Sequence, residues 1–294
     1  MTLGKLLSYA EMGRDSRQIE ALTEAGIPVV WDSGAFSVFT GRAEISVEDH
    51  TRWVLANQDS HPHDRYLALD VIGDPGATLA NYQHAVEEGA RVEPTIHFGT
   101  PIEAVEGLLN VRVPDWINVG GLVGQRDDRQ SAAMLAAVRR AIPPSVKVHA
   151  LGCTRTSVAS LVPFEGCDSS TWLTWGQYHQ ISLWNPLRDR FEVFGSRTPR
   201  DWERVHRAGR WVRETYGLTP TFLQSPIDRS SYRQGNRAGI ESLRLFTEFT
   251  KNLHNTESIC YLAGDCGGDS FGLGAEYLVA NYAHQPHPFL GAST

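Results

Sequence analysis

The sequence has no apolar run that approaches the ~20 residues needed to cross a bilayer. Cysteine is scarce: four residues are scattered over 294 positions, which fits a reducing compartment better than a disulfide framework. Positive charge is not in excess, and the formal net charge of −7 excludes a generally basic nucleic-acid coat protein but not a local basic face. The stretch from Met1 to Ala10 has one Lys and too few apolar residues for a secretory signal. We therefore expect a cytoplasmic protein with no membrane partner.

Two kinds of cofactor motif are also missing. No Gly-x-Gly-x-x-Gly and no phosphate loop follows the first predicted strands, which disfavours a dinucleotide-binding fold. Cys260 and Cys266 are followed by His284 and His287, but this spacing is loose for a structural zinc site. We expect no cofactor and no metal.

Three aspartates stand where predicted strands end. The apolar run 27–30 leads into Asp32, the run 66–69 leads into Asp70, and a short segment after Gly166 ends at Asp168. In parallel α/β proteins, chemistry takes place at the carboxyl ends of the strands. These three carboxylates are therefore the first candidates for a functional site.

Strand and helix patterns alternate up to residue 172 with a period of roughly 25 to 35 residues, as parallel βαβ units require. We predict an α/β protein with a (β/α)8 TIM-type barrel; an open doubly wound sheet is the alternative. Strands are predicted over 3–10, 27–30, 67–70, 92–98, 116–119, 146–151 and 167–168. Helices are predicted over 16–25, 47–58, 75–89, 101–109, 127–141 and 156–161, the second with Ser46 as its N-cap.

After residue 172 the alternation stops. We predict a hairpin over 179–194, an Arg-rich helix over 198–216, a loop over 225–237, a helix over 239–253, a closing strand over 258–264 and an irregular tail from His284. The chain is expected to form a single barrel domain over 1–294, with 173–257 as an insertion that faces nucleic acid.

The segment from Arg197 to Lys251 is basic, with eleven Arg or Lys against six Asp or Glu, a net charge of +5 in an acidic chain. It forms either a solvated helical face or a surface that contacts phosphates. The spacing of Arg200, Arg204 and Arg207 places them on one helical face. The candidates for nucleic-acid binding are Arg200, Arg204, Arg207, Arg229, Arg233 and Arg237.

A single Asp at a strand end is more often a helix cap or a turn former than a catalyst. Here, however, each of the three lies beside small residues, which let a ligand approach the backbone. Two carboxylates at one site can divide the work: one acts as nucleophile and the other as acid. This chemistry suits attack at an anomeric carbon.

The ordered motifs over residues 28–172 resemble those of the tRNA-guanine transglycosylase superfamily, a family of β/α barrels. The resemblance rests on Asp32-Ser33-Gly34-Ala35-Phe36-Ser37, Ala68-Leu69-Asp70, Gly120-Gly121-Leu122-Val123-Gly124, Leu151-Gly152 and Cys167-Asp168. It implies that Asp168 is the nucleophile on C1′ of the nucleoside and that Asp32 is the general acid/base. It further implies a base-binding role for Asp70, Ser33, Gly34, Phe36, His97, Gly120, Gly121 and Leu122.

Ala35 and Ser37 replace a Gly and a Gln of the family motif, and the family's zinc cluster is missing. With the short chain, these departures resemble the divergent branch found in bacteriophages and bacterial DNA-modification clusters, which exchanges guanine in DNA for a 7-deazaguanine. The implied partners are DNA, a 7-deazaguanine base and DNA-modification proteins, in a bacterial or phage-infected cell. The alternatives are a tRNA substrate, a nucleoside or glycoside hydrolase on the same barrel, and a non-catalytic barrel that binds purines or nucleic acid.

Overall fold

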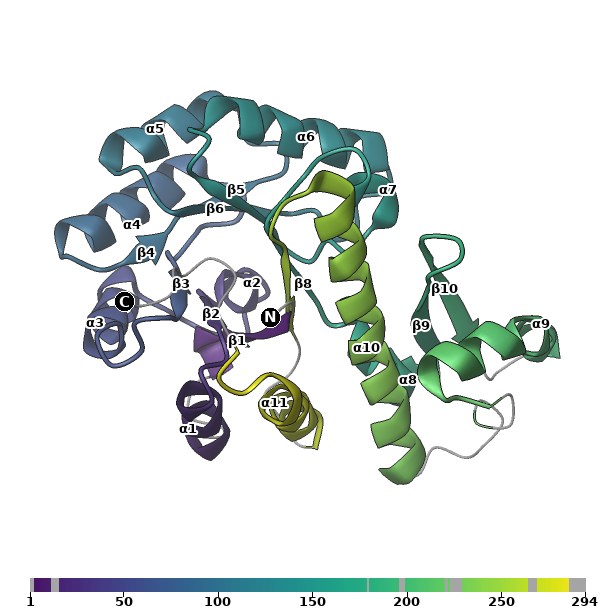
Figure 1. The fold of residues 1–294 in the computed structure, drawn as a ribbon. Helices are drawn as coiled ribbons and strands as arrows, with labels where there is room; N and C mark the ends of the chain where they lie inside the picture. Colours follow the sequence, from purple (N-terminus) through teal and green to yellow (C-terminus); the bar gives the residue numbers. More distant parts are fainter. Residues whose placement is uncertain are drawn as a thin grey trace.

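In the computed structural model, a nearly closed, barrel-like sheet of nine parallel strands is surrounded by helices (Figure 1). A separate two-stranded antiparallel hairpin packs beside it. The structure describes residues 3–11, 16–178, 180–195, 199–219, 222, 229–263 and 269–285. None of the helices in these ranges is long and apolar enough to cross a membrane.

The strand order is β4-β3-β2-β1-β11-β8-β7-β6-β5. The strands are β1 (Leu3–Ser8), β2 (Val29–Asp32), β3 (Arg65–Leu67), β4 (Val92–Glu93), β5 (Thr95–His97), β6 (Trp116–Gly120), β7 (Lys147–Ala150), β8 (Gly166–Ser169) and β11 (Ile259–Leu262). The two ends of this order, β4 and β5, are separated only by Pro94, so the sheet nearly closes on itself. The predicted strand 92–98 is therefore interrupted, because proline has no N–H to donate to the ladder.

Helices cover the outside of the barrel. They are α1 (Ser16–Glu24), α3 (Val47–Asn57), α4 (Pro75–Glu87), α5 (Glu103–Val111), α6 (Asp128–Ala141), α7 (Thr156–Ala159), α10 (Arg229–His254) and α11 (Asp269–Tyr282). Ser46 caps α3 as predicted, since its side chain accepts a hydrogen bond from the Asp49 N–H. The main core lies between these helices and the sheet and contains Leu7, Val29 and Ile117 among many buried apolar residues.

Short elements follow several strands. They are η1 (Tyr9–Glu11) after β1, α2 (Ala35–Phe39) after β2, and η2 (Thr171–Leu173) with α8 (Thr174–Tyr178) after β8. The sequence patterns did not predict α2, whose five residues are too few for a helical period to show.

The hairpin β9 (Gln180–Asn185) and β10 (Arg190–Gly195) packs with α9 (Pro199–Tyr216) around a second, smaller core. Ile181, Phe194 and Val212 are buried in it. Figure 1 shows these elements beyond α10, on one side of the barrel. The predictions of the hairpin and of the Arg-rich helix are confirmed.

The predicted loop over 225–237 is wrong from Arg229 onward, because α10 runs without a break from Arg229 to His254. The polar, Arg-bearing composition of this segment favours a loop in the sequence pattern. Two glycines lie in the observed helix, one at 235 in the predicted loop and one at 239 at the start of the predicted helix. In the structure they let the helix approach two buried tryptophans: a Cβ at Gly235 would lie 2.4 Å from Trp175 Cδ1, and one at Gly239 would lie 2.8 Å from Trp172 Cα. Close packing therefore outweighs the low helix propensity of glycine.

Helix α11 was also not predicted. Gly274, within α11, packs against the indole of Trp172: a Cβ at this position would lie 3.2 Å from Trp172 Cη2. The Trp172 Nε1–H donates to the Ala263 carbonyl oxygen at 2.8 Å. One buried tryptophan thus anchors α10, α11 and the end of β11.

A cluster of aromatic rings lies between α3 and the sheet. Trp53 contacts Trp31, Tyr9 and Tyr66, and the buried His50 packs edge-on against Tyr9 with ring centroids 5.0 Å apart. Burial lowers the pKa of His50 to about 4, against the opposing charge of Asp70. The imidazole is therefore neutral in the folded protein at physiological pH.

We expect a Gly235→Ala variant to lose about 1–3 kcal/mol of unfolding free energy, because its methyl group overpacks Trp175. A Gly76→Ala variant is the control. Gly76 also lies in a helix, but its Cβ would meet only Asp74 Oδ1, at 3.4 Å, so it should be neutral or stabilised. Urea denaturation of both variants is the measurement; equal stabilities would contradict the packing argument.

Stability should also depend on pH through His50. The unfolded chain binds a proton at His50 below its ordinary pKa of 6.5, whereas the folded protein resists protonation down to about 4. Unfolding free energy is therefore lost as pH falls through this window, by about 3 kcal/mol in all. Chemical denaturation at pH 7 and at pH 4 should show this loss reduced by that amount in His50→Gln. The exposed His63, changed to Gln, should leave the difference as in the wild type.

Candidate active site

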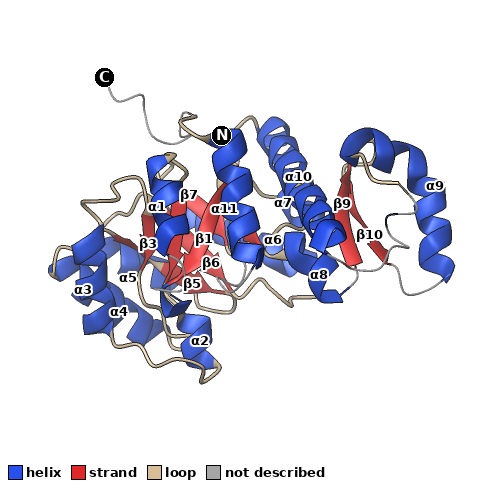
Figure 2. Ribbon diagram, turned by 90° about the horizontal axis from the view of Figure 1, so that it is seen from below, coloured by secondary structure: helices blue, strands red, loops and turns tan. Residues whose placement is uncertain are grey.

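The sequence-predicted acidic residues gather at the carboxyl end of the barrel strands. Asp32 is the last residue of β2, Asp168 is the third residue of β8, and Asp70 follows β3 by three residues. The predicted strand end at Asp70 is thus corrected to Leu67. His97, the last residue of β5, joins them. Because all these strands are parallel, the four side chains belong to one end of the barrel, the end at which α2 lies in Figure 2.

Asp70 forms the centre of a hydrogen-bonded group. The Ser33 hydroxyl donates to Asp70 Oδ1 at 2.8 Å, and His97 Nε2 lies 2.6 Å from Asp70 Oδ2. The side chain of Asp70 is 7% exposed and that of His97 is 16% exposed. An ionised carboxylate only accepts, so Nε2 of His97 carries the proton of this hydrogen bond. The structure thus joins three residues that the sequence predicted separately.

Gly120 makes room for this histidine. A Cβ at Gly120 would lie 3.0 Å from His97 Nδ1 and 3.1 Å from Cε1. In the glycine-rich motif 120–124, Gly121 is exposed, whereas the Leu122 side chain is buried in the main core between the helices and the sheet. The Leu122 carbonyl oxygen already accepts a hydrogen bond from Arg155 Nη2 at 3.3 Å.

Asp168 is held by one of its two carboxylate oxygens. Oδ1 accepts from the Gly152 N–H at 2.9 Å and lies 3.1 Å from His149 Nε2. Within the described part of the chain, Oδ2 has no hydrogen-bond partner. The residue is 8% exposed. The carboxylate is therefore oriented through Oδ1, while Oδ2 forms no hydrogen bond with these residues.

The partner of His149 fixes which of its ring nitrogens carries the proton. Arg65 Nη1 lies 3.1 Å from His149 Nδ1, and a guanidinium can only donate. Nδ1 is therefore the acceptor and Nε2–H donates to Asp168. Burial lowers the pKa of His149, and the charge of Arg65 lowers it further, whereas the hydrogen bond that His149 donates to Asp168 acts in the opposite direction. The imidazole is neutral and serves as a fixed donor to the carboxylate.

Arg65 lies inside the barrel and pairs with Glu93, whose carboxylate accepts from Nε at 2.9 Å and from Nη2 at 2.6 Å. Its Nη2 also donates to Asn118 Oδ1 at 3.2 Å, and its guanidinium lies 3.8 Å from the centre of the Trp116 ring. Burial alone lowers the pKa of Arg65, but Glu93 raises it above the ordinary value. The arginine is therefore permanently charged and links β3, β4, β6 and β7.

Asp32 adjoins a tight turn. Its Oδ2 accepts the Gly34 N–H at 3.0 Å, and Gly34 has a positive φ of 84° where it begins α2. The carboxylate is half-buried. Phe36, on the first turn of α2, is 60% exposed.

The candidate arginines whose side chains the structure describes line two different hollows. Arg207 lines a groove of about 420 Å3 between α9 and the hairpin, together with Arg188, Arg190 and Trp211. Arg233 and Arg237 line a different hollow between α9, α10 and α11, where Arg233 pairs with Glu276 at 3.0 Å. Arg200, Arg204 and Arg229 lie in helices α9 and α10, and their side chains lie outside the described residues.

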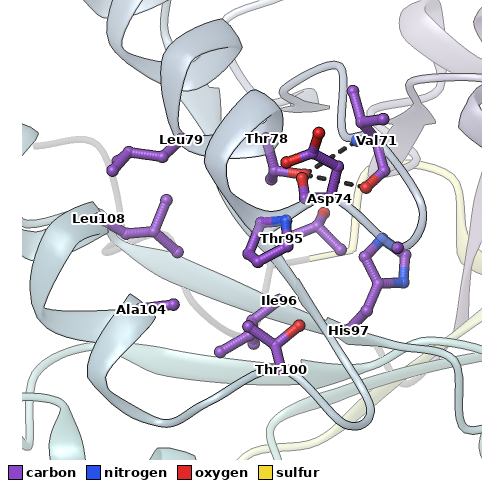
Figure 3. A pocket seen from close by; sticks show the side chains of 12 residues that line it. Val71, Asp74, Thr78, Leu79, Thr95, Ile96, His97, Thr100, Ala104 and Leu108 are labelled. Carbon is purple, nitrogen blue, oxygen red and sulfur yellow. Dashed lines mark hydrogen bonds between the residues drawn. The ribbon is translucent and has the colours of Figure 1, made fainter.

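A small cavity of about 40 Å3 lies on the outer side of His97, between α4 and α5 (Figure 3). Thr78 lines it and accepts the Val71 N–H at 2.9 Å. This volume has room for a few water molecules and is too small for a purine. The cavity is therefore not the base site.

No group of three or more His, Cys, Asp or Glu within the described ranges is arranged to hold a metal ion. Cys260 is buried in β11, whereas Cys266 and His287 lie outside the described residues. A scan against protein-family models and a search of curated proteins found no match to this chain.

The sequence reasoning missed the polar interior of the barrel. Arg65, Glu93, Asn118 and His149 are each buried in a short strand at an inward position. Such residues could have been recognised in the sequence, because a polar residue inside a buried strand needs a hydrogen-bond partner on a neighbouring strand.

We expect Arg65→Met to lose about 3–5 kcal/mol of unfolding free energy, because it leaves Glu93 buried without its counter-charge. The double variant Arg65→Met/Glu93→Leu should recover at least half of this loss. Arg52→Met removes an exposed pair with Asp49 and should leave the stability nearly unchanged. Denaturation curves of the variants test this; additive losses in the double variant would contradict the pairing.

Proposed function

We propose that this protein is a base-exchange glycosyltransferase that replaces guanine in DNA with a 7-deazaguanine derivative. The observation that carries the proposal is Asp168, a carboxylate held by two donors on Oδ1 with Oδ2 left over. A nucleophile needs one fixed orientation and one oxygen that is not already hydrogen-bonded. The motif order that resembles the transglycosylase superfamily assigns the nucleophile to the same residue.

In the proposed reaction, Asp168 Oδ2 attacks C1′ of the target nucleoside while the bond from C1′ to the base nitrogen breaks. The guanine leaves with that electron pair and takes a proton from Asp32. The incoming base then gives its proton to Asp32, and its nitrogen displaces Asp168 from C1′. Two displacements retain the configuration at C1′.

The group Ser33, Asp70 and His97 is the proposed site for the base. The N–H and amino groups of guanine are donors and match the remaining acceptor positions of the Asp70 carboxylate. The two known hydrogen bonds to Asp70 hold its plane fixed.

We infer that β4 and β5 are two halves of one strand, because β4 pairs with β3 while β5 pairs with β6. Counted in this way, the sheet is the eight-stranded TIM-type barrel of the family it resembles. In such barrels the site is built at the carboxyl ends of the strands, which is where Asp32, Asp70 and Asp168 lie here.

DNA rather than tRNA is proposed from the resemblance of this short chain to the phage and bacterial DNA-modification branch. The elements over 173–257 are proposed to face the nucleic acid, since the exposed Arg207 and Arg237 offer cationic groups to phosphates. The target guanine must leave the base stack to reach Asp168.

A hydrolase on the same barrel is the second candidate function. It is favoured by the same free Oδ2 of Asp168, because water can take the place of the incoming base. Release of guanine from DNA without any added base would favour hydrolysis over exchange.

We expect DNA from cells that express this chain with a 7-deazaguanine precursor to contain a 7-deaza-2′-deoxyguanosine derivative. Mass spectrometry of digested nucleosides is the measurement, and tRNA from the same cells is digested in parallel. Asp168→Asn should fold and abolish the product, because an amide cannot form the glycosyl ester. The matched control is Asp59→Asn, at a side chain that is 89% exposed. Product in tRNA alone would reassign the substrate, and product with Asp168→Asn would exclude this nucleophile.

A further inference from the structure

The rim at the carboxyl end of the barrel carries several large apolar side chains that are exposed to solvent. Of the eleven large apolar side chains that are exposed in the described ranges, five lie on segments that directly follow strands β2, β3 and β6. They are Phe36, Val38, Phe39, Val71 and Val123. Exposed apolar side chains that gather around one site mark a binding surface.

Helix α2 carries the largest of these side chains. Phe36 is 60% exposed and Phe39 is 64% exposed. Their spacing of three residues places both rings on one side of α2. The helix begins three residues after Asp32, so these rings belong to the rim of the candidate active site.

An arginine completes this surface. The Arg42 guanidinium lies 5.4 Å from the centre of the Phe36 ring, and its Nε donates to Thr40 Oγ1 at 2.9 Å. It is exposed and, within the described part of the chain, forms no ion pair with a carboxylate. Its positive charge is therefore available to an external anion.

We propose that α2 and Arg42 contact the nucleic-acid strand beside the extruded guanine, with Phe39 stacked on a neighbouring base and Arg42 on the adjoining phosphate. The proposal rests on the proposed function and extends it beyond the base site. Two aromatic faces beside an unpaired guanidinium match alternating bases and phosphates, which distinguishes this occupant from a purely apolar partner. A base that leaves the stack also exposes the faces of its neighbours, which an aromatic side chain can cover.

The test uses the full chain and a DNA duplex with 2-aminopurine next to a guanine, because the fluorescence of 2-aminopurine changes when its stacking changes. Wild-type protein should change the fluorescence on binding. Phe39→Ala should weaken binding about tenfold or more and remove the fluorescence change. Leu161→Ala is the matched control, since Leu161 is 61% exposed but lies after α7, away from this surface.

Arg42→Gln should weaken binding and lower the slope of log Kd against log salt by about 1, because one phosphate contact is lost. Phe39→Ala should leave that slope unchanged. The two residues are thereby separated by their roles as well as by their affinities.

Unchanged binding of DNA by Phe39→Ala would overturn the proposal. It would also be overturned if the wild-type protein sedimented as a dimer and Phe39→Ala as a monomer, because the surface would then bind a second copy of the chain. Failure of the proposed function has a different signature. In that case DNA carries no 7-deazaguanine, while binding still depends on Phe39 and is retained by Asp168→Asn.

Discussion

The buried guanidinium of Arg65 is the constraint on which both the barrel and the candidate site depend. A charge inside a protein is tolerated only when its partners replace water, and Arg65 has them on three other strands: Glu93, Asn118 and His149. Each partner must keep its position for the charge to stay satisfied. The packing of the barrel interior is therefore specified by polar geometry as well as by volume.

This requirement extends to the end of the barrel where the acidic residues lie. Arg65 fixes the tautomer of His149, and His149 in turn donates to Asp168. The second group, Ser33, Asp70 and His97, is organised in the same way, since each side chain limits the orientation of the next. The candidate site therefore consists of two carboxylates held by neighbouring strands, with Asp32 on a third segment.

Much of the fold follows from local patterns. The strand-helix alternation up to residue 172, the Ser46 cap and the hairpin were predicted because each depends on residues close together in the chain. The errors occur where distant residues decide. The polar, Arg-bearing residues up to Arg237 indicate a loop when taken alone, but the segment from Arg229 is helical and Gly235 packs there against Trp175. Pro94 divides one strand in two for a purely local reason, although its position at the barrel closure was not evident.

The sequence by itself indicated that Asp32, Asp70 and Asp168 lie near the carboxyl ends of strands, because apolar runs followed by a polar residue and small residues are local features. Only the tertiary structure decided which carboxylate oxygens of these residues accept hydrogen bonds. Asp168 meets His149 from the preceding strand, and Asp70 meets a histidine 27 residues away. Hydrogen bonds between strands depend on register and on barrel curvature. Neither register nor curvature can be predicted from the spacing of residues along the chain.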